Sequence, residues 1–459
     1  MFGKYIIGYN GFSLSNKVIF IQQSRPPPKK EIYMSQFQTT SSQSWFSRIG
    51  GAIKGIFIGL IIFVIGFPVL WMNEGDAVRN TNALNELTKV TIDVGKPEIK
   101  PENEGKPVFM TGPAATQDVL TDSVFGISEN AIRLEREVQI YQYVEHEHSE
   151  TKKKMGGGTE TVTTYTYEPA WVDAAIDSNT FADPEARNKC RNVGIMRFQD
   201  DELMATNVSF GAFKFGPEII SKIGGRESYK LAPDFQLPPQ MKALGARIEG
   251  EYVVVPYTAP STVTANAVGQ AVNAVAGNGD PNAAGQAVAN AVNNAVVQQP
   301  VTQIGDLRVK FTISKPHDVS LIAVQKGDTF TDYKAKNGKT QFLFRDGTHT
   351  AEDLFAAKAA SNKMKRWLFR VIGFVLMYIG LGMVFRPLSV LADVIPFLGT
   401  IVGKGTSFVA FILAAICSLV TIAIAWIAYR PVIGISLLVV AGVCVYLFIS
   451  KKKAAAAQA

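Results

Sequence analysis

The stretch G-I-F-I-G-L-I-I-F-V-I-G-F-P-V-L-W-M, from Gly55 to Met72, holds 18 consecutive residues without a charge. A bilayer core requires about 20 apolar residues per helix, so this stretch predicts a membrane span. Three further uncharged runs lie close together near the C-terminus, and they are Val371 to Phe385, Gly405 to Tyr429 and Pro431 to Ser450. Four spans that frame one long polar segment place that segment entirely on one side of the membrane.

These runs predict a multi-pass α-helical membrane protein with four spans and a large strand-rich α+β extracytoplasmic domain. The expected divisions are a cytoplasmic N-terminal tail (1–49), a first span (50–72), the extracytoplasmic domain (73–365), a second span (366–385), a cytoplasmic interfacial loop (386–404), a third and a fourth span (405–429 and 431–450) and a cytoplasmic tail (451–459).

The distribution of charge predicts on which side of the membrane each polar segment lies. Residues 73–365 hold 31 Lys and Arg against 37 Asp and Glu, whereas the rest of the chain holds 15 against 2. Basic residues concentrate on the cytoplasmic side of membrane proteins, which predicts that both termini are cytoplasmic. Lys363, Lys365 and Arg366 flank the second span on the side that this rule does not favour. The basic balance therefore indicates membrane anchoring, and we expect no nucleic-acid partner because no basic cluster joins a reading motif.

Two segments differ in composition from the rest. Residues 1–33 mix aromatic side chains with a Pro-rich basic stretch, which makes Met34 a candidate for the true start. Residues 261–299 are almost entirely Ala, Val, Asn, Gln and Gly, with G-Q-A-V at Gly269 repeated at Gly285. Valines at helical spacing predict an inserted helical hairpin. It is either an insertion without function or an element for oligomerisation or membrane-surface contact.

Within the polar segment, Ile132 to His148 alternates apolar and polar residues as a half-buried strand does. Thr159 to Tyr167 predicts its hairpin partner, with Lys152 to Gly158 as the tip and Tyr165 and Tyr167 paired with Tyr141 and Tyr143. Further strands are expected at Arg247–Tyr257, Asp306–Ile313, Val319–Val324 and Thr340–Phe344, and helices after a cap at Asn73 and at Pro169–Ile176, Phe213–Ile223 and Ala351–Met364.

Few residues in the polar segment suggest chemistry. His146 and His148 share one side of the predicted strand and could bind a metal, but catalytic zinc normally needs three ligands and no third is evident. An exposed polar strand end is the simpler interpretation. Gly156 to Gly158 lacks the Lys-Ser/Thr that follows a phosphate loop. Cys190 has no partner in the segment, which leaves an intermolecular disulfide open. We therefore predict no enzyme, no catalytic residue and no cofactor.

Four stretches give the chain a resemblance to a known family. They are W-M-N-E-G-D-A-V-R (Trp71 to Arg79), L-T-D-S-V-F-G-I-S-E-N-A-I-R-L-E-R-E-V-Q-I-Y-Q-Y-V-E-H-E (Leu120 to Glu147), G-D-L-R-V-K-F (Gly305 to Phe311) and I-A-Y-R-P (Ile427 to Pro431). With them the chain resembles the LUMA, or transmembrane protein 43, family from about Trp45 to Leu438. The segment 261–299 and the first 33 residues depart from the family pattern, and His148 stands where the family leads us to expect an acidic residue.

The resemblance implies a four-span protein with a large extracytoplasmic domain and no catalytic residues to carry over. In animals such proteins lie in the endoplasmic reticulum and inner nuclear membrane and organise membrane-protein complexes. The short polar tail favours a bacterial relative in an inner membrane, with a periplasmic domain. We predict a non-enzymatic membrane scaffold whose partners are the lipid bilayer, other membrane proteins and further copies of itself. Glycines in two spans could pack helices together (Gly55, Gly59, Gly66, Gly373, Gly380 and Gly382). The alternative is an ion channel or lipid-handling protein.

Overall fold

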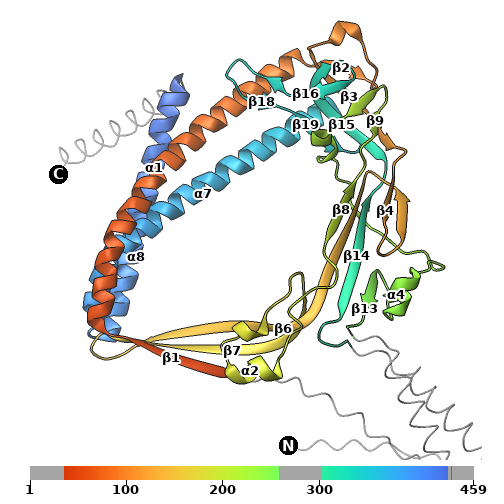
Figure 1. Ribbon diagram of the computed structural model, residues 1–459. Coiled ribbons are helices and arrows are strands. Elements are labelled where there is room, and N and C mark those ends of the chain that lie inside the picture. The colour runs from red at the N-terminus through yellow and green to blue at the C-terminus, as the bar shows by residue number, and fades with distance from the viewer. Residues whose placement is uncertain (1–35, 258–301, 433–435, 437–459) are drawn as a thin grey trace, which may run out of the picture.

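The computed structural model describes residues 36–257, 302–432 and 436. Three long helices form one side of a three-sided frame, a strand-rich domain forms the second, and a long β-hairpin closes the third (Figure 1). The proposed start at Met34, the insertion 261–299 and nearly all of the predicted fourth span and tail lie outside the described residues. Predictions for those segments therefore stay predictions.

The three helices are each long and apolar enough to cross a membrane, and they are α1 (Trp45–Val90), α7 (Ala351–Ala392) and α8 (Pro396–Tyr429). Helix α1 has 46 residues, which corresponds to about 69 Å at 1.5 Å per residue. That is more than twice the roughly 30 Å of a bilayer core. The predicted spans 50–72 and 366–385 therefore lie inside longer helices, and 405–429 is the C-terminal part of α8.

Two boundary predictions at these helices are wrong. Asn73 does not cap a new helix, because α1 runs through it and the Asn73 amide donates a hydrogen bond to the Arg366 carbonyl on α7 at 3.1 Å. Residues 386–404 do not form an interfacial loop, because α7 continues to Ala392 and α8 begins at Pro396. A proline in the first turn of a helix loses no hydrogen bond, so Pro396 suits the start of α8.

Glycines allow α1 and α7 to lie close together. An ideal Cβ added at Gly59 would lie 2.6 Å from the Gly380 carbonyl oxygen, and one added at Gly380 would lie 2.6 Å from the Gly59 carbonyl oxygen. Gly66 and Gly373 approach side chains of the opposite helix in the same way, whereas Gly382 has no atom near its Cβ position. The predicted glycine faces are therefore used largely within the chain, and at these positions they are not free to join two copies.

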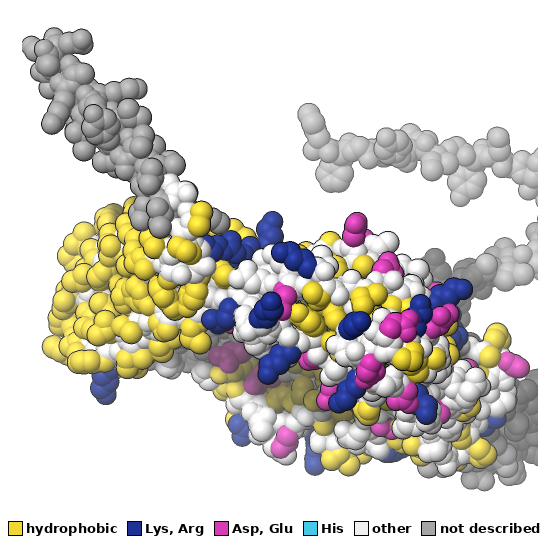
Figure 2. Space-filling model, turned by 90° about the horizontal axis from the view of Figure 1, so that it is seen from above, with side chains coloured by type: hydrophobic (Ala, Val, Ile, Leu, Met, Phe, Trp, Pro, Cys, Tyr) yellow, Lys and Arg dark blue, Asp and Glu magenta, His cyan; other side chains and the backbone are white. Residues whose placement is uncertain are grey.

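Apolar side chains cover the outer surface of the helices. Figure 2 shows this surface as a continuous hydrophobic region beside a strand domain with interspersed charges. Phe57, Ile61 and Phe408 are all more than 60% exposed. Because soluble proteins rarely expose apolar patches of this extent, the surface suits contact with lipid.

The strand domain contains two large sheets and smaller pairs in the described ranges. Its helical turns are η1 (Pro101–Asn103), η2 (Ser178–Thr180), α2 (Pro184–Lys189), α3 (Pro217–Ile220) and α4 (Pro239–Ala243). Its strands are β1 (Phe37–Gln43), β2 (Ile92–Gly95), β3 (Pro107–Thr116), β4 (Val119–Asp122), β5 (Ile127–Asn130), β6 (Arg133–Lys153), β7 (Thr159–Val172), β8 (Asp201–Met204), β9 (Val208–Phe210), β10 (Phe213–Phe215), β11 (Glu227–Ser228), β12 (Arg247–Glu249), β13 (Tyr252–Val255), β14 (Leu307–Ser314), β15 (His317–Lys326), β16 (Thr329–Thr331), β17 (Tyr333–Lys334), β18 (Thr340–Gln341) and β19 (Leu343–Asp346).

One sheet has the order β1-β7-β6-β14-β13-β12, with β8 beside β6 and β11 beside β14. The other has the order β10-β9-β3-β15-β16, with β2 and β19 attached to β3 and β15. All pairs are antiparallel except β2 with β3. Helices α1 and α7 reach the second sheet directly, because Leu84, Leu87 and Leu354 pack with Phe109 and Ile322 in one buried cluster. The strand domain is therefore mounted on continuous helices.

The predicted hairpin is confirmed as β6 and β7, and both strands are longer than predicted. Leu134, Val138 and Ile140 are buried on the same face, as the alternation predicts. The predicted tyrosine pairs are wrong, because Tyr141 lies opposite Trp171 and Tyr165 lies opposite Glu147. The tight tip begins after Lys153, and this sets a register in which no two of these tyrosines lie directly opposite each other.

Two predicted helices are also corrected. Residues 169–172 continue β7, since Pro169 to Val172 pair with Ile140 to Tyr143 of β6. The segment 213–223 begins as the strand β10 and contains only the short helix α3. Phe213 and Phe215 alternate with Lys214 and are buried, which is the pattern of a strand rather than of a helix. The helix at 351–364 and the strands at Asp306–Ile313 and Val319–Val324 are confirmed. The single strand predicted at Arg247–Tyr257 is instead the hairpin of β12 and β13, and Thr340–Phe344 is divided between β18 and β19.

Candidate functional site

The histidine pair lies on the exposed part of the β6–β7 hairpin. His146 lies opposite Thr166 and His148 opposite Thr164, and the His148 side chain is 79% exposed. Throughout residues 36–257 and 302–432, no group of three or more His, Cys, Asp or Glu side chains is placed to bind a metal ion. Cys190 is fully buried, so it offers no surface thiol for a disulfide with another protein. Burial also raises the pKa of the Cys190 thiol.

The Y-Q-Y-V-E stretch, Tyr141 to Glu145, binds the segment from Ala182 to Asn192 to the hairpin. Asn192 exchanges hydrogen bonds with the backbone of Tyr143 at 2.9 Å. The Glu145 carboxylate accepts from the Tyr167 hydroxyl at 2.7 Å and from the Ala182 amide at 2.6 Å. Burial, and then the hydrogen bond to Glu145, raise the pKa of Tyr167. The stretch that carries the family resemblance therefore stabilises the fold here.

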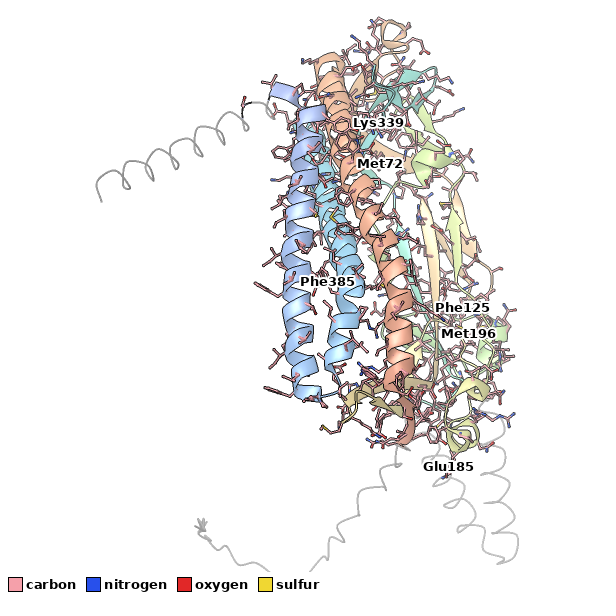
Figure 3. All side chains as sticks on the ribbon, turned by 90° about the vertical axis from the view of Figure 1, so that its left-hand side faces the viewer. Met72, Phe125, Glu185, Met196, Lys339 and Phe385 are labelled. Atoms are coloured by element: carbon pink, nitrogen blue, oxygen red, sulfur yellow. The ribbon has the colours of Figure 1, made fainter. Side chains whose placement is uncertain are left out.

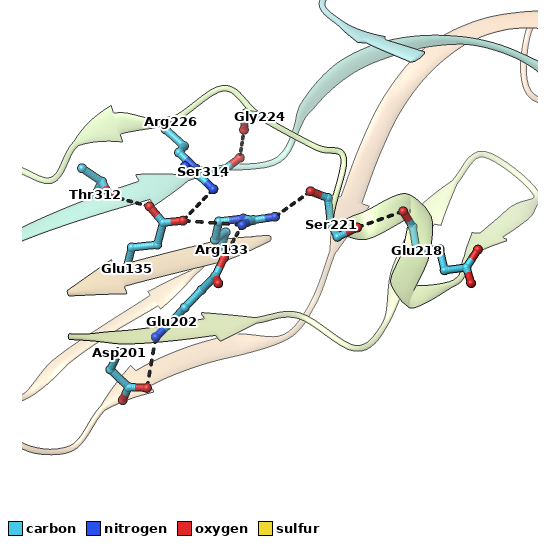
Figure 4. Close-up of polar contacts among 10 residues, drawn as sticks. All are labelled: Arg133, Glu135, Asp201, Glu202, Glu218, Ser221, Gly224, Arg226, Thr312 and Ser314. Atoms are coloured by element: carbon cyan, nitrogen blue, oxygen red, sulfur yellow. Dashed lines mark hydrogen bonds and ion pairs between the residues drawn. The ribbon is translucent and has the colours of Figure 1, made fainter. Parts of the chain in front are cut away.

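A second polar cluster joins three strands of the first sheet (Figure 4). Arg133 on β6 is buried, contacts Glu202 on β8 and donates to the Ser221 carbonyl at 3.0 Å. Glu135 pairs with Arg226 at 2.8 Å and accepts from Thr312 on β14 at 3.1 Å. Figure 4 shows these side chains directed at one another across the strands, so Arg133 and Glu135 each have partners of opposite charge, although the buried Arg133 Nε has no hydrogen-bond partner among the described residues. The arrangement presents no open nucleophile or base.

Buried charges of the membrane helices meet at a cluster that we call the Glu74 junction: Glu74, Arg370 and Trp426. Glu74 on α1 is 3% exposed and pairs with Arg370 on α7 through two hydrogen bonds, of 2.6 and 3.0 Å. Trp426 on α8 donates its indole N–H to Glu74 Oε2 at 2.9 Å. The Arg370 guanidinium also lies over the Trp426 ring, at 5.6 Å from the centroid. One carboxylate therefore connects all three helices.

Neighbouring residues of the W-M-N-E-G-D-A-V-R stretch also contribute to the contact between α1 and α8. The Trp71 ring lies 5.5 Å from that of Tyr429 on α8. A Cβ added at Gly75 would lie 2.6 Å from the Tyr429 ring, so any larger residue would separate α1 from α8. The stretch thus supplies a carboxylate, a glycine and an aromatic ring to one helix crossing, which gives this part of the resemblance a physical role.

A second buried carboxylate lies at the opposite end of the helices, in what we call the Asp393 junction: Trp45, Arg48, Lys153, Gly157 and Asp393. Asp393, in the turn between α7 and α8, is fully buried and accepts from Arg48 of α1 and from Lys153 of the hairpin, the latter at 2.6 Å. Trp45 donates to the Val390 carbonyl at 2.8 Å. Gly157 has φ of +80° and lies against the Trp45 ring, a position that only glycine suits.

The Asp393 junction places the hairpin tip beside the α7–α8 turn, since the Gly156 amide donates to the Val394 carbonyl at 3.1 Å. Strand β1, which precedes α1, also pairs with β7. The predicted topology assigned the hairpin to the outside and residues 386–404 to the inside. Both assignments cannot hold for segments in direct contact, because a polar hairpin cannot lie in lipid. The side of each segment therefore stays a prediction that a labelling experiment can decide.

Neither junction was identified from the sequence. Glu74 and Asp393 lie outside the uncharged runs that predicted the spans. A signal existed for Asp393, because residues outside 73–365 contain only one other acidic residue, Glu31. Glu74 lies within one of the stretches that carry the family resemblance. Such a carboxylate next to a span suggests a buried pair when a basic residue borders a neighbouring span.

The chain is similar to known proteins along most of its length. The family model described as Transmembrane protein 43 matches residues 140–431. Transmembrane protein 43 of Homo sapiens is 27% identical over 405 residues, which cover 86% of this chain and 89% of the relative. The protein of the same name from Rattus norvegicus is 28% identical over the same coverage. Transmembrane protein 43 homolog of Drosophila melanogaster is 25% identical over 404 residues, which cover 86% of this chain and 93% of the relative. No solved structure matches the chain.

Proposed function

The chain belongs to the transmembrane protein 43 family, and on this premise we propose that it is a non-enzymatic integral membrane scaffold that organises membrane-protein complexes. The observation that supports the proposal is the attachment of the strand domain at both ends of the helices. At one end α1 and α7 continue into the second sheet, and at the other the hairpin tip joins the Asp393 junction. A domain attached twice holds its surface in a fixed position.

The buried polar contacts support the same proposal. The clusters at Glu74, Asp393, Arg133 and Glu145 join separate segments of the chain, and each carboxylate or guanidinium has protein partners. A scaffold requires such fixed geometry, whereas an enzyme requires reactive groups open to substrate. The membrane in which the scaffold acts is part of the proposal: a bacterial inner membrane, or the endoplasmic reticulum and inner nuclear membrane in a eukaryote.

Cross-linking in native membranes tests the scaffold function. We expect the full chain to be recovered in complexes with other membrane proteins or with further copies of itself. Asp393→Asn, which loosens one attachment of the strand domain, should reduce these complexes. Glu249→Gln is the matched control, because Glu249 forms an exposed pair with Arg247 on its own strand, β12, and takes no part in the attachment to the helices. Recovery of monomers alone from native membranes would reject the proposal, and equal complexes from both variants would reject the role of the double attachment.

A further inference from the structure

A groove between α1 and α7 lies at the same level as the Glu74 junction. It has a volume of about 370 Å³ and is lined by Val69 and Met72 of α1, Phe369 of α7 and polar residues of both helices. Figure 3 shows Met72 between Lys339 and Phe385 along the helices. The groove therefore lies where the apolar part of the helices meets their polar extension.

The polar wall of the groove carries positive charge that nearby carboxylates do not neutralise. Lys365 and Arg366 line it. Asp76 also lines it, but its carboxylate already pairs with Arg79 at 2.8 Å and with Lys339 at 2.9 Å. The other acidic residue close by, Glu74, is bound to Arg370. The groove therefore has an excess of basic groups next to an apolar wall.

Two donors in this wall lack partners. Arg366 Nε and Asn362 Nδ2 are buried and have no hydrogen-bond partner within the described ranges. The Arg366 backbone carbonyl is held by Asn73, which fixes the residue at the groove while leaving its guanidinium without a carboxylate. Buried donors without partners are energetically unfavourable. A ligand with several acceptor oxygens would relieve this.

From these observations we propose that the groove binds one phospholipid, with its phosphate on Arg366 and Lys365 and its acyl chains along Val69, Met72 and Phe369. Arg binds phosphate oxygens through two parallel hydrogen bonds, and the Lys stem can lie along apolar surface while its ammonium reaches the headgroup. The apolar wall selects a lipid over free phosphate. The site also accounts for Lys365 and Arg366, two of the three basic residues that flank the second predicted span on the side that the positive-inside rule does not favour.

Native mass spectrometry of the purified full chain tests the proposal, with added phosphatidylglycerol as the probe. We expect one lipid retained per chain after delipidation. The double variant Lys365→Gln/Arg366→Gln should retain at least about tenfold less, because it removes the charge-assisted hydrogen bonds to phosphate. Lys363→Gln is the matched control, since Lys363 is exposed and lies outside the groove.

Two results would overturn the assignment. One is equal lipid retention by the double variant and the Lys363→Gln control. The other is displacement of the lipid by inorganic phosphate at low millimolar concentration, which would identify a soluble phosphate site instead. If the double variant does not fold, Arg366→Lys serves in its place: it keeps the charge, loses the paired hydrogen bonds and should retain less lipid than the control. Full retention by Arg366→Lys would then contradict the proposal.

Discussion

The Glu74 junction and the Asp393 junction lie at opposite ends of the same helices and are both built around a buried carboxylate. Glu74 has one cationic partner, Arg370, and an indole N–H, and all three groups belong to the helices. Asp393 has two cationic partners, and one of them, Lys153, belongs to the strand domain. The first junction therefore holds the helices to one another, whereas the second holds the hairpin to the helices.

The two junctions also differ in solvent access. The side chains of Glu74 and Arg370 are 4% and 13% exposed, so an unpaired partner would remain largely out of water. At the other junction Arg48 is 12% exposed, much like Arg370, whereas Lys153 is 30% exposed and can regain hydration when its partner is lost. Removal of one partner from a buried pair is strongly destabilising because the remaining charge stays desolvated. Separation of Arg370 from Glu74 should accordingly be less tolerated than separation of Lys153 from Asp393.

The largest expected effect is an all-or-none labelling result, which tests whether the Asp393 junction forms in the membrane at all. In a cysteine-free background, Met155→Cys at the hairpin tip and Thr400→Cys near the α7–α8 turn should react with an impermeant maleimide from the same side of sealed vesicles. The contact between Gly156 and Val394 requires this. Lys334→Cys reports the side of the other end of the strand domain. Reaction of the first two cysteines from opposite sides would show that the Asp393 junction does not form in the membrane.

The next largest effect is expected at Glu74. Glu74→Gln should lower the free energy of unfolding by about 3–5 kcal/mol, because Arg370 would remain buried without its counter-charge. The matched control Asp76→Asn breaks two partly exposed pairs, with Arg79 and with Lys339, and should change it by at most about 1 kcal/mol for each pair. Thermal unfolding in detergent or nanodiscs measures both. Similar losses in the two variants would remove the distinction between buried and exposed pairs on α1.

A smaller effect is expected between the junctions, where α1 and α7 touch. Gly380→Ala places a methyl group against the Gly59 carbonyl and should destabilise the protein by roughly 1–3 kcal/mol, as overpacking does. Gly382→Ala, two residues further along α7, meets no atom and should stabilise the helix by up to about 1 kcal/mol. The difference in unfolding temperature measures the contact. If the signs were reversed, close helix contact at Gly59 would be refuted.

The smallest effect is a pH dependence at the start of α7. The Thr350 side chain and then its backbone amide hold the pKa of Asp353 below its usual value, in a capping box. Because the folded pKa is the lower one, this stabilisation is present above the unfolded pKa near 3.8 and is lost as the pH falls through the folded value. Asp353→Asn should flatten the dependence of stability on pH below about 4. An unchanged acid profile would argue against the cap.

Local patterns predicted much of the fold, and contacts distant in sequence did not follow from them. The alternation from Ile132 to Ile140 is a property of one strand, so it predicted both the strand and its buried face. The offset of Tyr141 from Tyr165 depends on where the tip closes, and that is set by the partner strand. The uncharged runs located the spans but not the buried carboxylates beside them. Glu74 pairs with Arg370, which is 296 residues further along the sequence, only because α1 and α7 are adjacent in the fold.

One feature of the long helices has a mechanical consequence. From Pro68 to Val90, α1 runs without a break out of its apolar stretch and into the cluster around Leu84 and Leu87. Helices tilt when their apolar length and the hydrocarbon thickness differ. Because the helix is continuous from Pro68 to Val90, a change in bilayer thickness that tilts this part of α1 would rotate the second sheet with it, so the strand domain would respond to the thickness of the membrane that holds it.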